Sequence, residues 1–217
     1  PSDELAKERH GSFGKNEMWY IMGADNGAEL IIGFNQEVDV DQYEKLLQNN
    51  DLLKVMNAQT VRAGDAFYIP TGRVHAIGAG VLLAEIQQTS DVTYRIYDYD
   101  RIDAKTGQTR ELHTDLAKNA IDFELHDSYR TEYQEEVSSV NRLIHSPYFN
   151  TDILILDSPM DRDLSKRDSF TIYMGVEGNA ELMVNNMVFD LKLGETILIP
   201  AECERVQLNS EGCRLLE

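Results

Sequence analysis

Short runs of apolar and β-branched residues dominate the chain, and Gly, Asn and Asp separate one run from the next. This punctuation is typical of an antiparallel β protein, in which short strands are joined by turns. The runs expected to form strands are Met18–Met22, Glu29–Phe34, Gly64–Ile69, Val81–Gln88, Thr93–Asp98, Asp152–Asp157, Phe170–Met174, Ala180–Val184 and Glu195–Pro200. The pattern therefore predicts a mainly β fold.

Two segments depart from the strand pattern. Apolar residues in Asp39–Met56 recur at helical spacings, and Thr114–Ile121 is typical of one short helix. Both are expected to be short helical insertions between strands. The segment Asp122–Asn141 is polar and acidic, and we expect it to form a connector.

An internal repeat indicates two related β units. Residues 19–30 align without gaps on residues 171–182, and residues 61–70 align on residues 191–200. The offset falls from 152 to 130 because the first copy holds the helical insert and the second has a tight Asn185–Asn186 turn. We expect a first unit at 1–121 with its insert at 39–56, a connector at 122–141, and a second unit at 142–217.

Charge and composition narrow the classes of partner. The chain has 20 Lys+Arg, 38 Asp+Glu and a net charge of −18, with no basic block, which argues against nucleic acid and against an anionic membrane surface. No apolar run approaches the roughly 18 residues of a membrane span. The two cysteines, Cys203 and Cys213, do not suggest a disulfide framework. We therefore expect a reduced, cytoplasmic protein; the sequence indicates no oligomeric state.

Residues 64–75, GDAFYIPTGRVH, predict a strand followed by a Pro-x-Gly turn that presents His75 at the start of the next strand. This G-x5-P-x-G-x2-H pattern resembles the second cupin motif, in which the histidine binds a metal inside a jelly-roll barrel. Glu17 is the expected partner ligand because strand alternation places it on one face with Trp19 and Ile21. Taken singly, His75 could be a buried structural histidine and Glu17 a solvated acid.

The second copy of the repeat offers a comparison with these two positions. The alignment places Ser169 where Glu17 stands in the first copy and Arg205 where His75 stands. Neither residue type is a usual zinc ligand. The second unit is therefore predicted to keep the barrel pattern without a metal.

Three stretches carry a resemblance to a known family: Lys15-Asn16-Glu17-Met18-Trp19-Tyr20, the block 69–101, and Arg110-Glu111-Leu112-His113. They resemble the short bacterial type I mannose-6-phosphate isomerases, a zinc-dependent bicupin family. The resemblance implies a bicupin fold and the reversible interconversion of mannose 6-phosphate and fructose 6-phosphate. It also implies one divalent metal, zinc, bound by Glu17 and His75. Further ligands are expected upstream of Pro1, because the family's Gln-x-His-Pro segment ends where Pro1 stands, so the chain reads as lacking its first strands.

The same resemblance assigns the remaining site residues. It places Lys15 and Arg95 at the substrate and implies Lys15, Glu85, Asp91 and Arg95 as catalytic residues. Local cations would have to hold the phosphate, because a net charge of −18 provides no long-range attraction for an anion. Glu85, charged among apolar neighbours, could be the base, a partner of a metal ligand, or a structural acid.

Alternatives remain for the role of Arg95 and for the function of the protein. Arg95 could instead form an ordinary ion pair with Asp98 or Asp100. At the level of function, the alternative is a non-catalytic cupin that binds a sugar or a sugar phosphate. An iron-dependent cupin oxygenase is disfavoured by the Lys15-Asn16-Glu17 context and by cations suited to phosphate.

Overall fold

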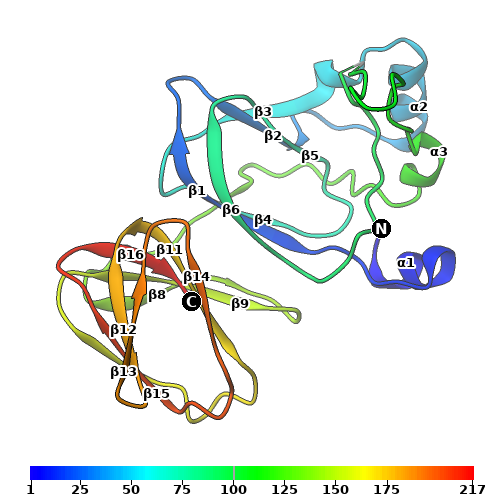
Figure 1. The fold of residues 1–217 in the computed structure, drawn as a ribbon. Helices are drawn as coiled ribbons and strands as arrows, with labels where there is room; N and C mark the ends of the chain where they lie inside the picture. Colours follow the sequence, from blue (N-terminus) through cyan, green and yellow to red (C-terminus); the bar gives the residue numbers. More distant parts are fainter. Residues whose placement is uncertain (100) are drawn as a thin grey trace. The chain divides into compact units, whose positions relative to one another are not determined.

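The computed structural model describes residues 1–99 and 101–217, and its contacts divide the chain into two compact units, Pro1–Arg130 and Thr131–Glu217 (Figure 1). Strands dominate both units, so the predicted mainly β class is confirmed. Among the described residues, no helix is both long and apolar enough to cross a membrane.

The N-terminal unit is built from two antiparallel sheets. One has the order β6-β1-β4 and continues into β7, where the chain passes from one unit to the other; the second has the order β3-β2-β5. The elements are α1 Asp3–His10, β1 Glu17–Ala24, β2 Glu29–Phe34, α2 Val40–Gln48, the 3-10 helix η1 Leu52–Val55, β3 Met56–Thr60, β4 Ala66–Ile69, β5 His75–Ile77, β6 Val81–Gln87, α3 Thr114–Ala117 and β7 Arg130–Thr131.

The core of this unit lies between its two sheets. Alternate side chains of β1 and β4 meet those of β2, which is the arrangement of a β-sandwich. The buried members are Trp19, Ile21, Leu30, Ile32, Val61, Phe67, Ile69 and Tyr129. Burial of each large apolar side chain contributes about 1.5–3 kcal/mol, so this layer fixes the separation of the strands that carry the site.

The predicted insert at 39–56 forms α2 and η1, between β2 and β3. Asp39 begins α2 with a capping box, in which its side chain accepts from the Gln42 amide and the Gln42 side chain accepts from the Asp39 amide. Tyr43 is the buried residue of α2, and it packs with Phe34 and Phe123. The insert thus has a small apolar cluster of its own.

The C-terminal unit also has two antiparallel sheets, with the orders β10-β15-β12-β13 and β14-β11-β16-β9-β8. Its core joins both sheets through residues such as Tyr173, Leu182 and Leu208. The strands are β8 Ser139–His145, β9 Asn150–Leu156, β10 Met160–Asp163, β11 Thr171–Gly178, β12 Ala180–Val184, β13 Met187–Leu191, β14 Thr196–Ile199, β15 Arg205–Asn209 and β16 Cys213–Leu216.

The sequence repeat corresponds to a structural repeat. The consecutive strands β1 and β2, one in each sheet of the first unit, recur as β11 and β12, and β4 recurs as β14. Asn185 and Asn186 have φ values of 50° and 62° and join β12 to β13 in the place that α2 and η1 take in the first unit. Asparagine tolerates this left-handed geometry, which tight hairpin turns require.

Strand register corrects one detail of the alignment between copies. Glu17 pairs with Ile69 in the first unit, whereas the aligned Ile199 pairs with Thr171 in the second. Thr171 rather than Ser169 therefore takes the place of Glu17. The Thr171 hydroxyl accepts a hydrogen bond from Arg167 at 3.0 Å, so a neutral group again replaces the carboxylate.

Two local expectations differ from the structure. Residues 93–98 alternate like a strand but are irregular, because they pair with no neighbouring strand and instead exchange hydrogen bonds with His113. The helix α1 was not predicted, since Ala6 is its one buried residue and it has no apolar stripe. The sequence features that indicate this helix lie at its two ends: Ser2 is the N-cap, and Gly11, at φ 63°, is the C-cap.

A buried carboxylate, Glu217, organises the polar interior of the C-terminal unit. Arg162 binds both of its oxygens, at 2.6 and 2.7 Å, and Arg167 and the Tyr173 hydroxyl also donate to it. Burial opposes ionisation, but the hydrogen bonds from Arg162 and Tyr173 outweigh it and hold the pKa of Glu217 below its ordinary value.

We expect Glu217→Gln to lower the free energy of unfolding of this unit at pH 7 by about 2–3 kcal/mol, somewhat less than for a fully buried ion pair, because both arginines are partly exposed. The folded pKa is depressed, so the contribution is present above the unfolded value of about 4.3 and is lost as pH falls through the folded value. Denaturant unfolding between pH 3 and 7 measures this. Glu181→Gln, at an exposed β12 position, is the control, and equal stability of both variants would contradict the prediction.

Candidate metal and substrate site

Glu17 and His75 lie side by side in the N-terminal unit. Glu17 begins β1 and is fully buried, and His75 begins β5, so each is held at the end of a strand. Glu17 Oε1 lies 2.6 Å from His75 Nε2. Within the described part of the chain, this buried oxygen receives no hydrogen bond of good geometry. The two predicted ligand atoms therefore point at one another across a very short gap.

The orientation of the His75 ring follows from its other contacts. Its Nδ1 lies 2.8 Å from the Arg73 carbonyl oxygen, which can only accept, so Nδ1 carries the proton. The Trp19 ring stands edge-on to the imidazole, with centroids 5.2 Å apart. Nε2 then faces the Glu17 carboxylate, and it is the ring nitrogen that could bind a metal in place of a proton.

This donor set fits a divalent metal. A buried carboxylate oxygen 2.6 Å from an imidazole nitrogen is electrostatically unfavourable unless a cation or a proton joins the two atoms. Imidazole nitrogen and carboxylate oxygen are both ordinary zinc ligands. Glu17 and His75 would supply two of the three or four protein ligands that zinc usually takes.

Lys15 and Glu85 extend the charged cluster. Lys15 Nζ donates to Glu17 Oε2 at 2.6 Å and to Glu85 Oε1 at 3.5 Å, while Trp19 Nε1 donates to Glu85 Oε2 at 2.9 Å. Burial raises the pKa of Glu17, but the contacts with His75 and Lys15 lower it more, so the net shift is downward. For Lys15, burial is outweighed by the two carboxylates, which raise the pKa of its ammonium group.

A cavity of about 430 Å³ opens over this cluster. Lys15, Glu17, His75, Glu85 and Arg95 all line it. Five of the six predicted site residues are thus brought together. Asp91 is exposed and does not line the cavity.

Arg95 reaches the cavity from the irregular loop that follows β6. Its backbone amide donates to His113 Nδ1 at 3.2 Å, and its side chain donates to the Glu111 carbonyl at 3.3 Å. Asp98 is instead held by both donor groups of Arg110, which depress the pKa of its carboxyl. The other predicted alternative partner, Asp100, lies outside the described residues.

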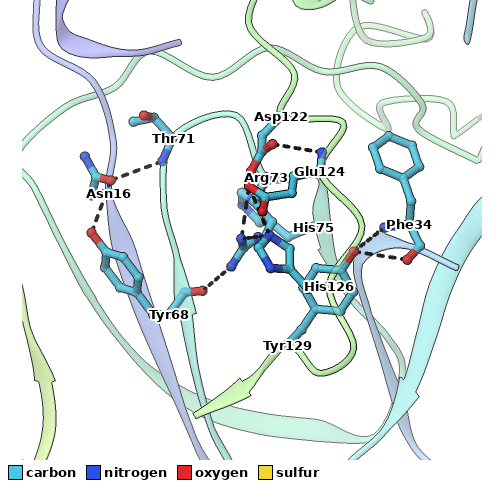
Figure 2. Close-up of polar contacts among 10 residues, drawn as sticks. All are labelled: Asn16, Phe34, Tyr68, Thr71, Arg73, His75, Asp122, Glu124, His126 and Tyr129. Atoms are coloured by element: carbon cyan, nitrogen blue, oxygen red, sulfur yellow. Dashed lines mark hydrogen bonds and ion pairs between the residues drawn. The ribbon is translucent and has the colours of Figure 1, made fainter. Parts of the chain in front are cut away.

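Several residues of the site carried no individual prediction. Arg101 and Arg110 also line the cavity, and Tyr94 and Tyr97 form part of its wall. Asn16 is buried and joins β1 to the turn after β4, because its Oδ1 accepts from the Thr71 amide at 3.1 Å (Figure 2). Its position between Lys15 and Glu17 was the available signal.

A second group of potential ligands lies near the turn. Asp122, Glu124 and His126 bring one ligand atom each within 4.8 Å of one another. Arg73 reaches into this group: its Nη2 lies 2.8 Å from His126 Nε2 and 3.8 Å from Asp122 Oδ2 (Figure 2). A guanidinium thus occupies the position where a metal would need the His126 nitrogen.

The two β units correspond to a bicupin fold, and the first of them holds the Glu17–His75 pair. Residues 139–216 match the family model described as "Mannose-6-phosphate isomerase, cupin domain". The predicted family resemblance is confirmed: the chain is homologous to mannose-6-phosphate isomerases, and its C-terminal unit carries their cupin domain.

Individual relatives show how far the similarity extends. Mannose-6-phosphate isomerase ManA of Bacillus subtilis (strain 168) is 33% identical over 203 residues, 92% of this chain and 63% of that protein. Mannose-6-phosphate isomerase of Streptococcus mutans serotype c (strain ATCC 700610 / UA159) is 41% identical over 121 residues, 56% of this chain and 38% of that protein. The chain therefore spans less than two thirds of these relatives.

Solved structures agree with the fold. The crystal structure of the mannose 6-phosphate isomerase from Bacillus subtilis superposes with a TM-score of 0.88 at 29% identity, over 100% of this chain and 68% of that one. A putative mannosephosphate isomerase from Archaeoglobus fulgidus superposes with a TM-score of 0.73 at 16% identity. The second likeness extends the fold alone to a distant relative.

We expect His75→Ala to weaken the binding of Co²⁺ or Zn²⁺ to the purified protein by more than about 100-fold, because a ligand is lost rather than an outer partner, whose loss costs roughly 10- to 100-fold. Isothermal titration measures the affinity. His145→Ala is the matched control, since His145 Nε2 also lies 2.7 Å from a carboxylate, that of Asp152. Unchanged affinity in His75→Ala, or an equal loss in both variants, would contradict the assignment.

Proposed function

We propose that the protein is a metal-dependent aldose–ketose isomerase that interconverts mannose 6-phosphate and fructose 6-phosphate. The observation that carries the proposal is the buried Glu17 Oε1 beside His75 Nε2, in a cavity that Lys15 and Arg95 also line. The names of the relatives ManA and the Streptococcus mutans enzyme support the same reaction.

Zinc is the metal we propose, held by Glu17 and His75 together with ligands beyond this pair. When bound, the ion acts as a Lewis acid that polarises substrate oxygens. The protein's own contribution is to orient these two ligands: Lys15 pairs with one Glu17 oxygen and leaves the other to face the ion. The Arg73 carbonyl keeps Nε2 of His75 facing the same point.

Cations along the cavity are proposed to bind the phosphate. The net charge of −18 gives an anionic substrate no long-range attraction, so binding depends on side chains within the cavity. The Arg95 side chain donates to a backbone carbonyl, and Arg101 lies over the Tyr99 ring, 4.9 Å from its centroid. Neither contact neutralises a charge. Arg95, with Lys15 nearer the metal ligands, is the principal candidate.

Glu85 is proposed to move the proton between C1 and C2 of the substrate. Glu17 serves the metal, and Asp98 is held by Arg110, which leaves Glu85 among the described carboxylates that line the cavity. Its partners Lys15 and Trp19 orient the carboxylate. We assign Asp91 no contact with the substrate, because it lies outside the cavity lining.

We also propose that the protein works in the cytoplasm on a phosphorylated sugar. The two cysteines, Cys203 and Cys213, are free thiols, which is usual in a reducing compartment.

A coupled assay that detects fructose 6-phosphate formed from mannose 6-phosphate tests the proposed activity. The protein is assayed after loading with Zn²⁺ and again after removal of the metal with a chelator. Turnover that depends on the metal is the expected result. Binding of mannose 6-phosphate without any turnover would contradict the isomerase and favour a sugar phosphate-binding cupin.

We expect Arg95→Ala to lower kcat/KM by roughly 30- to 1000-fold with metal affinity unchanged, because a charge-assisted contact in a desolvated site is worth about 2–4 kcal/mol. The coupled assay and metal titration measure the two quantities. Lys15→Met should likewise lose turnover. Arg62→Ala is the control, since its side chain is 87% exposed. Normal kinetics in Arg95→Ala would show that this residue does not serve the substrate.

A further inference from the structure

We propose that the Arg73 side chain is a positioning residue for His75, and that Asp122, Glu124 and His126 form a clasp for this arginine rather than a second metal site. The proposal rests on the proposed role of Glu17 and His75 as metal ligands. It concerns how the fold fixes the direction of the His75 ring before any metal binds.

The turn that carries Arg73 is attached to a distant segment of the chain. Gly72 has φ 93°, its carbonyl accepts from the Asp122 amide at 2.9 Å, and a Cβ at this position would lie 2.6 Å from the Ala120 carbonyl oxygen. Only glycine allows such a close approach. The backbone between β4 and β5 is therefore held against residues 120–122.

The Arg73 side chain is anchored on several sides in the same region. It is 13% exposed, and it donates to the Tyr68 carbonyl at 3.3 Å and to His126 Nε2 at 2.8 Å (Figure 2). Its guanidinium carbon lies 5.3 Å from the centroid of the Tyr129 ring. The Asp122 carboxylate, 3.8 Å away, balances the charge. A planar guanidinium with several donors suits this set of acceptors better than an ammonium group does.

Tyr129 makes the clasp rigid. Its hydroxyl donates to the Phe34 carbonyl and accepts from the Phe34 amide, both at 3.0 Å (Figure 2). The ring packs on Gly33, where an added Cβ would lie 2.2 Å from the Tyr129 Cζ atom. Gly33 and Phe34 belong to β2, and β2 pairs with β5 at Ile32 and His75, so Tyr129 and the strand that carries His75 are both attached to β2.

The consequence for His75 comes through the Arg73 backbone. The Arg73 carbonyl accepts from His75 Nδ1 at 2.8 Å, which sets both the tautomer and the direction of Nε2 toward Glu17. Outer contacts of this kind orient metal-binding histidines in general. Here the carbonyl that orients the ring belongs to a residue whose own side chain is fixed by a separate segment.

The arginine also accounts for the ligand-like group. A divalent ion at Asp122, Glu124 and His126 would need the His126 Nε2 lone pair that Arg73 Nη2 already approaches at 2.8 Å. Two positive charges would then share this confined space, which is strongly unfavourable. The Asp122 carboxylate and the His126 imidazole are instead partners of one guanidinium, and Glu124 Oε2 lies 4.0 Å from His126 Nε2.

Three variants test the proposal. His126→Leu removes the group that accepts from Arg73, and His126→Gln keeps an acceptor there. Arg73→Lys keeps the positive charge but loses the planar set of guanidinium donors. The first readout is the tautomer of His75 in the metal-free protein, by ¹⁵N NMR. The second is the affinity for Co²⁺ by titration. Arg62→Lys, at a position 87% exposed, is the control.

We expect His126→Leu and Arg73→Lys to mix the His75 tautomers and to lower Co²⁺ affinity by about 10- to 100-fold. His126→Gln and Arg62→Lys should stay within about threefold of the parent. All measurements are made at a temperature at which circular dichroism shows every variant to be folded. Should His126→Leu not fold, Arg73→Lys decides the outcome with the same two readouts.

Other results would overturn the proposal. An unchanged tautomer and unchanged affinity in Arg73→Lys, with affinity lost in Glu17→Gln, would leave the metal site standing and reject the positioning role. Loss of Co²⁺ binding in Asp122→Asn but not in Glu17→Gln would make the clasp the metal site. A different outcome separates the two proposals: if neither the parent nor any variant binds Co²⁺ but the His75 tautomer still responds, the positioning role is supported and the proposed metal function fails.

Discussion

The pairing of β1 with β4, and the turn that follows β4, is the constraint on which the site depends. The pair Glu17 and Ile69 fixes the buried end of β1, and six residues after Ile69 the chain has reversed to present His75. The reversal is possible because Gly72 has φ 93° and fits against the Ala120 carbonyl. Two residues far apart in sequence, buried Glu17 and the partly exposed His75, thereby meet at 2.6 Å in the lining of the cavity.

The two units surround their buried carboxylates, Glu17 and Glu217, with different partners. In the second unit Glu217 is fully matched by Arg162, Arg167 and the Tyr173 hydroxyl, so no lone pair remains for a ligand. In the first unit Lys15 binds one oxygen of Glu17, and the other oxygen faces His75 Nε2 at 2.6 Å. The second unit therefore has a closed, structural ion cluster, whereas the first has the carboxylate–imidazole pair that we propose as metal ligands.

Local patterns predicted the frame well because strand alternation and turn residues act over a few positions. Glu29–Phe34 and Ala180–Val184 were predicted with the bounds that β2 and β12 have. Residues 93–98 are an exception to this local prediction. Their alternation is typical of a strand, but Arg95 exchanges its backbone hydrogen bonds with His113. The clasp around Arg73 had no local pattern, since its partners lie about fifty residues further along the chain.

The acidic chain and its basic cavity are compatible because the two act over different distances. At physiological ionic strength charges are screened beyond about 8 Å, so the net charge of −18 lowers the rate at which anions arrive more than it weakens contacts inside the cavity. Among the described lining residues, basic groups outnumber acidic ones: Lys15, Arg73, Arg95, Arg101 and Arg110 against Glu17, Glu85 and Asp98. An anion small enough to enter gains from this local excess, whereas a large polyanion meets the acidic exterior. The charge distribution thus favours a small phosphorylated ligand over a nucleic acid.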